Sequence, residues 1–279
     1  MKSRKYLVYD VFTDTALSGN PLGIVVDCEG LDAAAMQAIT REFNLSETVF
    51  VLPPDKPGHR ARIRIFTPGH ELPFAGHPTV GSAIALAEQA ADDGTAGMLV
   101  LEENIGPVRC IVTRGEGASF AEFDLPKLPE RLPLSVDAAV LGAALGLPPH
   151  EIGFENHRPG AWSAGVPFVT VPVAGLAVAA RISFDTKAWG QAVQQAAAGI
   201  VPSAYVYCRE TVGHDCAFHT RMFSPWDGIT EDPATGSAAA AFAGAILHFD
   251  SQVDGSDRYW IEQGVEMGRP SRLRLEIDV

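Results

Sequence analysis

Two side chains that could hold or transfer a proton stand immediately before a proline, His77 and Asp232. Proline fits the first turn of a helix, because its missing N–H would have no hydrogen-bond partner there. The segments that follow, 80–90 and 234–247, are rich in alanine and apolar enough to form buried helices. The sequence therefore predicts that an imidazole and a carboxylate each mark the start of a buried helix.

The surroundings of these two residues are repeated along the chain. The pattern Arg-x-Phe-x-Pro begins at Arg64 and again at Arg221, an offset of 157 residues (221 − 64). The pattern Pro-x-x-Gly-Ser-Ala follows His77 and again Asp232, an offset of 155 residues (232 − 77). An offset near half the chain length indicates a duplicated domain, since solenoid repeats have periods of about 20–50 residues. In this register His77 and Asp232 are equivalent, which predicts that they face one shared cleft.

The composition is that of an ordinary globular protein. The 279 residues are 47% hydrophobic and 20% charged, which is enough apolar material for two domain cores. The formal net charge of −13 argues against a nucleic-acid partner, because phosphate binding needs clustered lysine and arginine. The four cysteines show no C-x-x-C spacing, and the longest apolar run, 238–247, is shorter than a membrane span of roughly 18 residues. We therefore expect a soluble cytoplasmic protein with no membrane partner.

Period-two and helical patterns outline both halves of the chain. The expected strands are 5–13, 22–27, 48–52, 60–65, 98–103, 108–113, 119–124, 167–173, 204–208, 258–262 and 272–279, and the expected helices are 32–43, 80–90, 186–197 and 234–247, with one more after Ser135. The proline-rich run 126–133 cannot be a helix or a central strand, so we interpret it as the interdomain linker. We expect the final strand to return to the first domain. The predicted domains are 1–124 plus 271–279, and 125–270.

Three motifs complete the pattern: S-E-T-V-F at 46–50, F-T-P-G-H-E-L-P-F-A-G-H-P-T-V-G at 66–81 and E-D-P-A-T-G-S-A at 231–238. In this order and spacing, over nearly the whole chain, the sequence resembles the PhzF-like family, the phenazine-biosynthesis F-type isomerases. The resemblance implies an α+β, diaminopimelate-epimerase-like fold, in which two pseudo-symmetric domains each wrap a curled, mostly antiparallel β-sheet or barrel around a central helix. It also implies an active site in the cleft between the domains, no cofactor, and a homodimer, as in many members. The best-known activity of the family is a proton-shift isomerisation of dihydro-3-hydroxyanthranilate in phenazine biosynthesis.

Glu47 lies in the first of these motifs, at the start of an apolar strand. From its surroundings alone, an exposed glutamate in a turn is the favoured interpretation. The resemblance implies instead that Glu47 is the general acid/base. A carboxylate suits this task if burial raises its pKa toward neutral pH, because it can then take a carbon-bound proton and return it elsewhere.

The two helix starts offer a second kind of chemistry. Helix N-termini supply N–H groups and partial positive charge, which suit a substrate carboxylate. Glycines there could equally serve tight turns, and Asp232 could be an ordinary N-cap. By the resemblance, His77 and Asp232 position and polarise the substrate. The residues that the resemblance implies for binding the acid are Ser46, Gly76, Gly236 and Ser237.

Other chemistries find less support in the sequence. In thiol-dependent relatives of this fold the paired helix starts carry cysteines, and neither start here does, which disfavours a two-thiol racemase. The histidines lack metal-binding spacing and no glycine-rich nucleotide loop is present, so we expect neither a metal nor a cofactor. The prediction is a cofactor-independent isomerase of a small carboxylic acid. The alternatives are an epimerase, racemase or dehydratase using the same base, and a non-catalytic small-molecule binding protein. Glu71 and Glu231 are left outside the predicted site.

Overall fold

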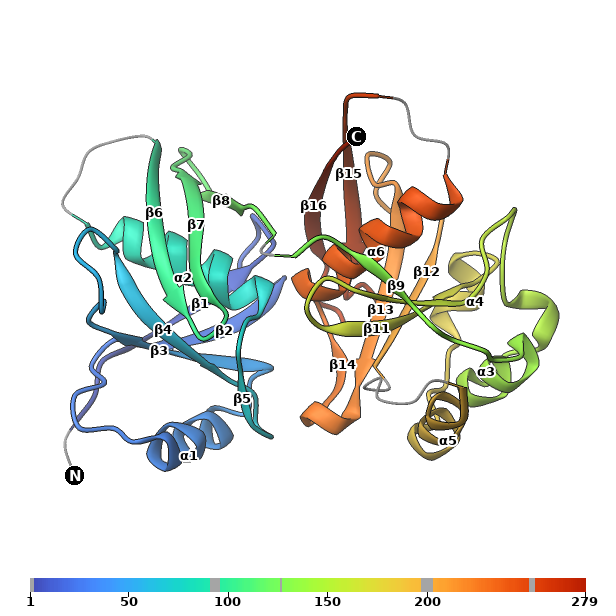
Figure 1. The fold of residues 1–279 in the computed structure, drawn as a ribbon, viewed down its shortest axis with the longest axis horizontal. Helices are drawn as coiled ribbons and strands as arrows, with labels where there is room; N and C mark the ends of the chain where they lie inside the picture. Colours follow the sequence, from blue (N-terminus) through green and yellow to red (C-terminus); the bar gives the residue numbers. More distant parts are fainter. Residues whose placement is uncertain (1–2, 91–95, 126, 197–202, 251–253) are drawn as a thin grey trace. The chain divides into compact units, whose positions relative to one another are not determined.

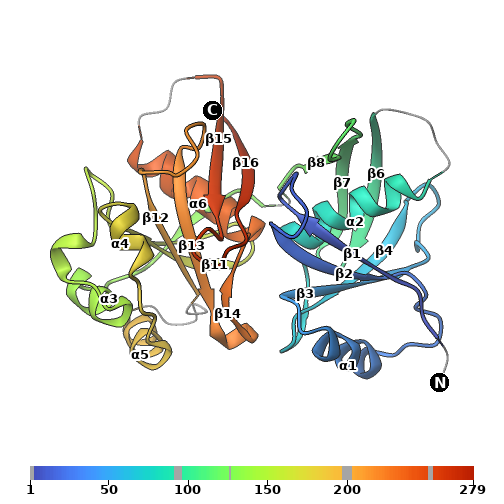
Figure 2. The same ribbon diagram turned by 180° about the vertical axis from the view of Figure 1, so that it is seen from behind.

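The computed structural model describes residues 3–90, 96–125, 127–196, 203–250 and 254–279. The chain divides into two compact units, Met1–Pro126 and Lys127–Val279, and each unit has its own eight-stranded sheet. In each unit the sheet curls around one central helix, which is α2 (Gly76–Glu88) in the first unit and α6 (Gly236–Phe249) in the second (Figures 1 and 2). The predicted α+β class, with a repeated sheet around a central helix, is confirmed.

The remaining elements of the first unit are β1 (Tyr6–Val11), β2 (Asn20–Val25), α1 (Ala33–Phe43), β3 (Glu47–Leu52), β4 (Ala61–Phe66), β5 (Glu71–Leu72), β6 (Ala96–Glu103), β7 (Gly106–Thr113) and β8 (Phe120–Phe123). The sheet order is β1-β2-β3-β4-β6-β7-β8, with β5 paired to β4. Two neighbouring pairs are parallel, β2 with β3 and β4 with β6, and the chain passes through α1 and α2 respectively between their strands. Asp32 caps α1 as predicted, since its side chain accepts from the Ala35 N–H at 2.8 Å.

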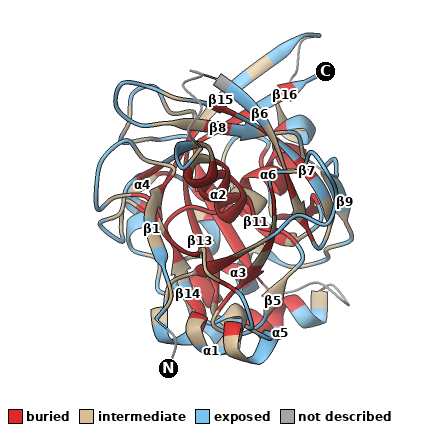
Figure 3. Cartoon of the chain, turned by 90° about the vertical axis from the view of Figure 1, so that its left-hand side faces the viewer, coloured by how far each residue is buried: buried red, intermediate tan, exposed pale blue. Residues whose placement is uncertain are grey.

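Small side chains let the sheet of the first unit close around α2. Ten of the thirteen helix residues are buried, and Figure 3 shows α2 as a buried element. Gly81 shows how tight the fit is: a Cβ there would lie 2.6 Å from Leu22 and 2.8 Å from Val11. A larger residue would force these strands away from the helix, so the glycine is required by close packing.

The remaining elements of the second unit are β9 (Glu130–Leu132), α3 (Ala138–Leu145), η1 (Pro149–Glu151), β10 (Gly160–Ser163), β11 (Pro167–Pro172), α4 (Leu176–Ala180), α5 (Thr186–Ala196), β12 (Ala204–Cys208), β13 (Phe218–Ser224), η2 (Pro225–Asp227), β14 (Ile229–Asp232), β15 (Ser256–Gln263) and β16 (Ser271–Asp278). The sheet order is β16-β15-β13-β12-β11-β10-β9, with β14 paired to β13. The parallel pairs are β11 with β12 and β13 with β15. A separate apolar cluster packs α3, α4 and α5 against β11 and β12.

The two units share one order of elements. The series β1-β2-α1-β3-β4-β5-α2-β6-β7 of the first unit corresponds to β10-β11-α5-β12-β13-β14-α6-β15-β16 of the second, and the parallel pairs fall at equivalent places. β8 and β9 extend opposite ends of the common order. The duplication therefore covers almost the whole unit, well beyond the repeated motif.

The strand pairing changes the register of the repeat. In the first unit Ile65 of β4 pairs with Leu72 of β5, and in the second Met222 of β13 pairs with Asp232 of β14. The offset is 157 residues on the long strands (222 − 65) and 160 on the short ones (232 − 72). The starts of α2 and α6 are also 160 residues apart (236 − 76).

The predicted equivalence of His77 and Asp232 is therefore wrong. The counterpart of Asp232 is Leu72, and the counterpart of His77 is Ser237. The 3₁₀ turn η2 lies in the second hairpin and lengthens it by three residues, so the prolines after the two polar residues do not align. Neither helix begins at its proline either: α2 begins two residues before it and α6 three residues after it.

The C-terminal strand and the linker also differ from expectation. β16 pairs antiparallel with β15 along eight residues, so the prediction that 271–279 returns to the first domain is wrong. The short connection 264–270 lets β15 and β16 pair as a hairpin. Gly264 and Gly268 in this connection have the positive φ angles that tight turns need. The proline-rich run holds the unit boundary, after residue 126, and also the short edge strand β9, which pairs with β10.

Candidate functional site

The first unit brings two of the predicted site residues together. Glu47 is the first residue of β3, and His77 is the second residue of α2. The Nδ1 atom of His77 lies 3.3 Å from Oε2 of Glu47 and 3.4 Å from Nδ2 of Asn20, which is the first residue of β2. All three residues are buried, with Glu47 8% exposed, so the interpretation of Glu47 as an exposed turn residue is wrong.

Burial decides the charge of the imidazole. Desolvation lowers the pKa of His77 to about 3, so the ring is neutral at neutral pH. A neutral ring carries one N–H, and with the proton on Nε2 its Nδ1 accepts from the Asn20 amide. With the ring neutral, the 3.3 Å approach of Nδ1 to Glu47 is a close polar contact and not an ion pair. The Nε2 atom is buried and has no hydrogen-bond partner among the described residues.

The two predicted binding residues of this unit lie beside that pair. Ser46 directly precedes Glu47 and is half-buried. Gly76 is the first residue of α2 and is buried. The residue at the N-cap is Ala75, which has no side chain that could accept from the helix N–H groups. The start of α2 therefore leaves its first N–H groups to be satisfied by something other than a side-chain cap.

In the second unit, Thr235 and Gln263 hold Asp232 in place. This aspartate is the last residue of β14 and is 2% exposed. The Thr235 hydroxyl donates to its Oδ2 at 2.5 Å. The Gln263 side-chain amide donates to the Asp232 carbonyl at 2.7 Å and to the Thr235 hydroxyl at 3.1 Å, and it accepts from the Thr235 N–H at 3.3 Å. The turn between β14 and α6 is thus fixed by hydrogen bonds to the side chain of Gln263, the last residue of β15.

Asp232 is not the N-cap of α6. That position is held by Thr235, which uses its hydroxyl on Asp232 and makes no side-chain cap. Gly236 and Ser237 follow as the first two residues of α6, and both are partly exposed while the rest of the helix is mostly buried. The structure therefore places Asp232, Gly236 and Ser237 along one short turn, with an accessible helix start.

The cysteines do not lie at the helix starts, and three of them are held in the protonated thiol form. The positions directly before the two helices hold Ala75 and Thr235. Burial raises the pKa of Cys28 to about 11 and the pKa values of Cys110 and Cys208 to about 12. These thiols stay protonated at neutral pH, which makes them poor nucleophiles and poor bases.

Over the described ranges, no group of three or more His, Cys, Asp or Glu side chains could hold a metal ion. No helix in the described part of the chain combines the length and apolarity needed to cross a bilayer.

Sequence reasoning missed Asn20, Thr235 and Gln263, which contact the predicted site residues. Thr235 lies within the motif 231–238. With the correct register of the repeat, its position directly before the start of α6 would have marked it as a candidate site residue. Gln263 had no such signal, because it reaches the site only through the pairing of β15 with β13. Glu71 and Glu231, left outside the site, prove to be equivalent residues that each bind an arginine.

The curled sheets and the polar residues at the helix starts define a recognisable class of protein. Residues 9–279 match the family model of phenazine biosynthesis-like proteins (PhzC-PhzF), and the chain belongs to this family. It is 66% identical to an uncharacterised isomerase of Mesorhizobium japonicum, over 100% of this chain and 92% of that protein. It is 38% identical to the trans-2,3-dihydro-3-hydroxyanthranilate isomerase of Pseudomonas aeruginosa, over 96% of this chain and 88% of that enzyme. The resemblance predicted from the motifs is confirmed.

Solved structures agree with this assignment. A phenazine biosynthesis protein of the PhzF family from Bacillus anthracis has a TM-score of 0.89 and 28% identity, covering 100% of this chain and 91% of that one. A hydroxyproline epimerase from Agrobacterium vitis has a TM-score of 0.60 at 13% identity, over 97% of this chain and 83% of that one. The second likeness shows a shared fold only.

Proposed function

We propose that this protein is an isomerase that shifts a proton within a small carboxylic acid, with Glu47 as the general acid/base. The observation that carries the proposal is the buried contact of 3.3 Å between Glu47 and His77. A carboxyl group that is removed from water and held by a neutral imidazole is suited to take up and release a proton. The similarity to trans-2,3-dihydro-3-hydroxyanthranilate isomerase supports the reaction type.

In the proposed reaction, the Glu47 carboxylate removes a proton from a carbon atom of the substrate, and the electron pair of that C–H bond moves into the adjacent unsaturated system. The resulting carboxylic acid exchanges its acidic proton with solvent and then delivers a proton to another carbon atom. Glu47 ends as it began, so the step is balanced without a redox partner. Positioned proton transfer of this kind contributes roughly 10²–10⁴ in rate.

His77 positions the base. With a pKa of about 3 the ring does not act as a charged acid at neutral pH. As a neutral group it can hydrogen-bond to Glu47 through Nδ1, and it can offer Nε2 to the substrate. Asn20 selects between the two ring tautomers, because its amide can donate to Nδ1 only when that nitrogen is unprotonated.

Each unit offers one helix start that is proposed to bind a carboxylate. Gly76 of α2 and Gly236 of α6 begin helices whose N-cap side chains do not satisfy the first N–H groups, and such N-termini attract anions. The Ser46 and Ser237 hydroxyls are the proposed side-chain donors. Asp232 is proposed to polarise the same substrate, with its carboxylate oriented by Thr235. We also propose cofactor independence, a homodimer and a cytoplasmic location.

Proton exchange tests the function directly. The enzyme is incubated in D₂O with trans-2,3-dihydro-3-hydroxyanthranilate and with a panel of other small unsaturated carboxylic acids. Isomerisation is expected to place deuterium at a carbon atom of the product or of recovered substrate, and Glu47→Gln should abolish this exchange. Glu42→Gln, an exposed change on α1, is the matched control and should exchange as the parent does. Binding of an acid without any exchange would support the non-catalytic alternative instead.

A further inference from the structure

Two polar devices recur at equivalent places in the two units. The first is an arginine–glutamate pair between the long strand and the short strand that leads to the central helix. Arg64 donates to Glu71 at 2.7 and 2.6 Å, and Arg221 donates to Glu231 at 2.7 and 2.8 Å. Both pairs are bidentate, which fixes the direction of each side chain. Glu231 is the residue next to Asp232, so the second pair sets the position of a proposed site residue.

The second device is a glutamate that holds a loop by two consecutive backbone N–H groups. Glu102, near the end of β6, accepts from residues 55 and 56 at 2.7 and 2.9 Å. Glu262, near the end of β15, accepts from residues 212 and 213 at 2.7 and 2.8 Å. These contacts follow the same offsets as the strands, 157 for the loops (212 − 55) and 160 for the glutamates (262 − 102).

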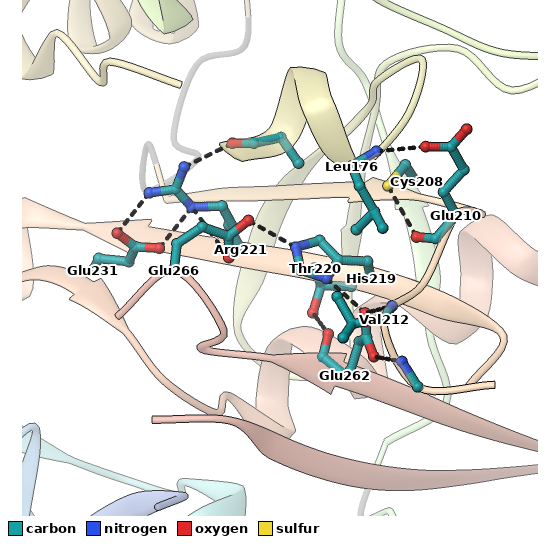
Figure 4. A network of polar contacts seen from close by, with 12 residues as sticks. Leu176, Cys208, Glu210, Val212, His219, Thr220, Arg221, Glu231, Glu262 and Glu266 are labelled. Carbon is teal, nitrogen blue, oxygen red and sulfur yellow. Dashed lines mark hydrogen bonds and ion pairs between the residues drawn. The ribbon is translucent and has the colours of Figure 1, made fainter. Parts of the chain in front are cut away.

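In the second unit the two devices are joined by two further residues (Figure 4). His219 of β13 lies between two carboxylates: its Nδ1 is 2.8 Å from Glu262, and its Nε2 is 2.9 Å from Glu266. The other oxygen of Glu266 lies 4.0 Å from Nε of Arg221. In the first unit the place of His219 is taken by Arg62, which pairs with Asp55 on its own loop.

The geometry requires a charged ring at His219. The residue is 1% exposed, and each of its ring nitrogens faces a carboxylate oxygen at less than 3 Å. Only an imidazolium donates from both nitrogens. Burial alone would lower the pKa of His219, but its hydrogen bonds to Glu262 and Glu266 outweigh this and raise the pKa to about 9.

We propose that His219 is a positioning residue whose buried positive charge holds Asp232 in place through its two neighbouring carboxylates. This deepens the proposed function and rests on the role assigned there to Asp232. One route runs from Glu266 through Arg221 to Glu231, the residue beside Asp232. The other runs from Glu262 to its neighbour Gln263, whose amide holds the Asp232 carbonyl.

Loss of the charge would act on both routes. Without an imidazolium, Glu262 and Glu266 face one another across a buried site, and like charges there repel. The 264–270 connection carries Glu266 and packs closely on the site turn: a Cβ at Gly264 would lie 2.6 Å from the Pro233 carbonyl oxygen. A shift of this connection therefore moves the turn that presents Asp232.

The charge of His219 is also sensitive to pH. Its pKa rises from 6.5 to about 9 on folding, so its contribution is fully present below pH 6.5 and is lost as the pH rises through 9. The hydrogen bonds from His219 lower the pKa values of Glu262 and Glu266 against the opposing effect of burial, so both stay ionised over this range. The titratable and charged groups around the ring are Glu262, Glu266, Arg221, Glu231 and the thiols of Cys208 and Cys216.

The test is a double-mutant cycle on kcat/KM with His219→Gln and Asp232→Asn, using the acid that shows Glu47-dependent exchange. Glutamine is neutral and can donate to only one of the two carboxylates. His219→Gln should lower kcat/KM by about 10- to 100-fold, as expected when a group is misplaced by about 1 Å. Asp232→Asn should then cost much less in the His219→Gln background than in the parent. His150→Gln, an exposed histidine change, is the control and should have no effect.

Additive losses would mean that His219 supports the fold without acting on Asp232, and would overturn the proposal. Unchanged kcat/KM in His219→Gln would also overturn it, while loss of exchange in Glu47→Gln would leave the proposed function standing. If His219→Gln does not fold, the pH profile of the folded parent enzyme decides. Its kcat/KM should fall through pH about 9, and Asp232→Asn should lack this limb. A parent profile that stays flat to pH 10 contradicts the proposal.

Discussion

The loop-holding glutamates of the two units, Glu102 and Glu262, occupy equivalent positions but lie in different surroundings. Glu102 is bonded to His59 at the edge of its own loop, and Glu262 is bonded to the buried His219. Both units also keep an arginine–glutamate pair before the central helix. Both units thus have the same arrangement of loop, hairpin and helix start. In the second unit, the charged ring of His219 also links the loop-holding glutamate to the arginine–glutamate pair through Glu266.

The same comparison explains where the proposed chemistry lies. In the first unit the candidate residue His77 is on the helix, and its neighbours are neutral or buried polar groups. In the second unit the candidate residue Asp232 is on the short strand. The two units therefore share one frame but carry their candidate functional side chains on different elements.

The largest expected effect separates these two roles. Glu47→Gln keeps the size of the side chain but removes its ability to carry the proton, so kcat should fall by at least about a hundredfold with KM little changed. Asp232→Asn should change both kcat and KM, because a positioning residue also contributes to the ground state. Steady-state kinetics of both variants measure the split. A near-normal kcat for Glu47→Gln would remove Glu47 from the mechanism.

The next prediction compares the two arginine–glutamate pairs. The Arg221 side chain is 8% exposed and the Arg64 side chain 20% exposed. Loss of a partner in a buried pair costs about 3 kcal/mol or more, and the cost falls toward about 1 kcal/mol as the pair becomes more exposed. Arg221→Gln should therefore destabilise by about 3 kcal/mol and Arg64→Gln by about 1 kcal/mol, measured by urea denaturation. Equal losses would show that the two pairs have the same energetic role.

The two buried histidines should respond to pH in opposite directions. The pKa of His77 is lowered from 6.5 to about 3, so the unfolded chain binds the extra proton first, and stability is lost as the pH falls below 6.5. The pKa of His219 is raised to about 9, so stability is lost as the pH rises from 6.5 through 9. At about 1.4 kcal/mol per pH unit, each limb should amount to about 3 kcal/mol over the range that it covers, pH 6.5 to 4 and pH 6.5 to 9.

Thermal unfolding from pH 4 to pH 10 measures both limbs. His77→Asn should flatten the acid limb and leave the alkaline limb unchanged, and His219→Gln should do the reverse. Loss of the alkaline limb in the His77 variant would show that the two histidines are not independent.

Local patterns predicted the elements well because they depend on neighbouring residues. The Asp32 cap, the alternating strands and the alanine-rich central helices are all of this kind. The register of the repeat could not be predicted, since the extra turn η2 begins at the last residue of one shared pattern, Pro225, and the next shared pattern gives no sign of the three added residues. The alternation in the last strand also could not show which sheet the strand joins. Such a pattern shows which face of a strand is buried but does not identify the neighbouring strand.

The candidate site was predicted only where a motif marked it. Glu47 and His77 come from separate motifs, and the structure places them in contact. The network around His219 had no local signal, since its residues approach one another through the pairing of β13 with β15, 43 residues apart in sequence at His219 and Glu262. Such contacts become visible only once the sheet is known.

The smallest expected effect concerns Glu103, which stands in the first unit where Gln263 stands in the second. The Thr79 hydroxyl lies 2.8 Å from the Ala75 carbonyl and 2.7 Å from Glu103. The hydroxyl has one proton for these two acceptors, so both contacts are hydrogen bonds at the same time only when Glu103 is protonated and donates to the hydroxyl oxygen. Burial raises the pKa of Glu103 to about 8, in agreement with this. A protonated glutamic acid has nearly the shape of glutamine, and like glutamine it can donate a hydrogen bond.

Glu103→Gln should therefore be within about 0.5 kcal/mol of the parent at pH 5. The folded pKa of Glu103 lies above its unfolded value of 4.5, so the parent loses stability as the pH rises through 8 and the variant does not. At pH 8 the variant should be the more stable of the two, as measured by urea denaturation at both pH values. Destabilisation at both pH values would show that Glu103 is ionised in the folded protein and that its resemblance to Gln263 is only positional.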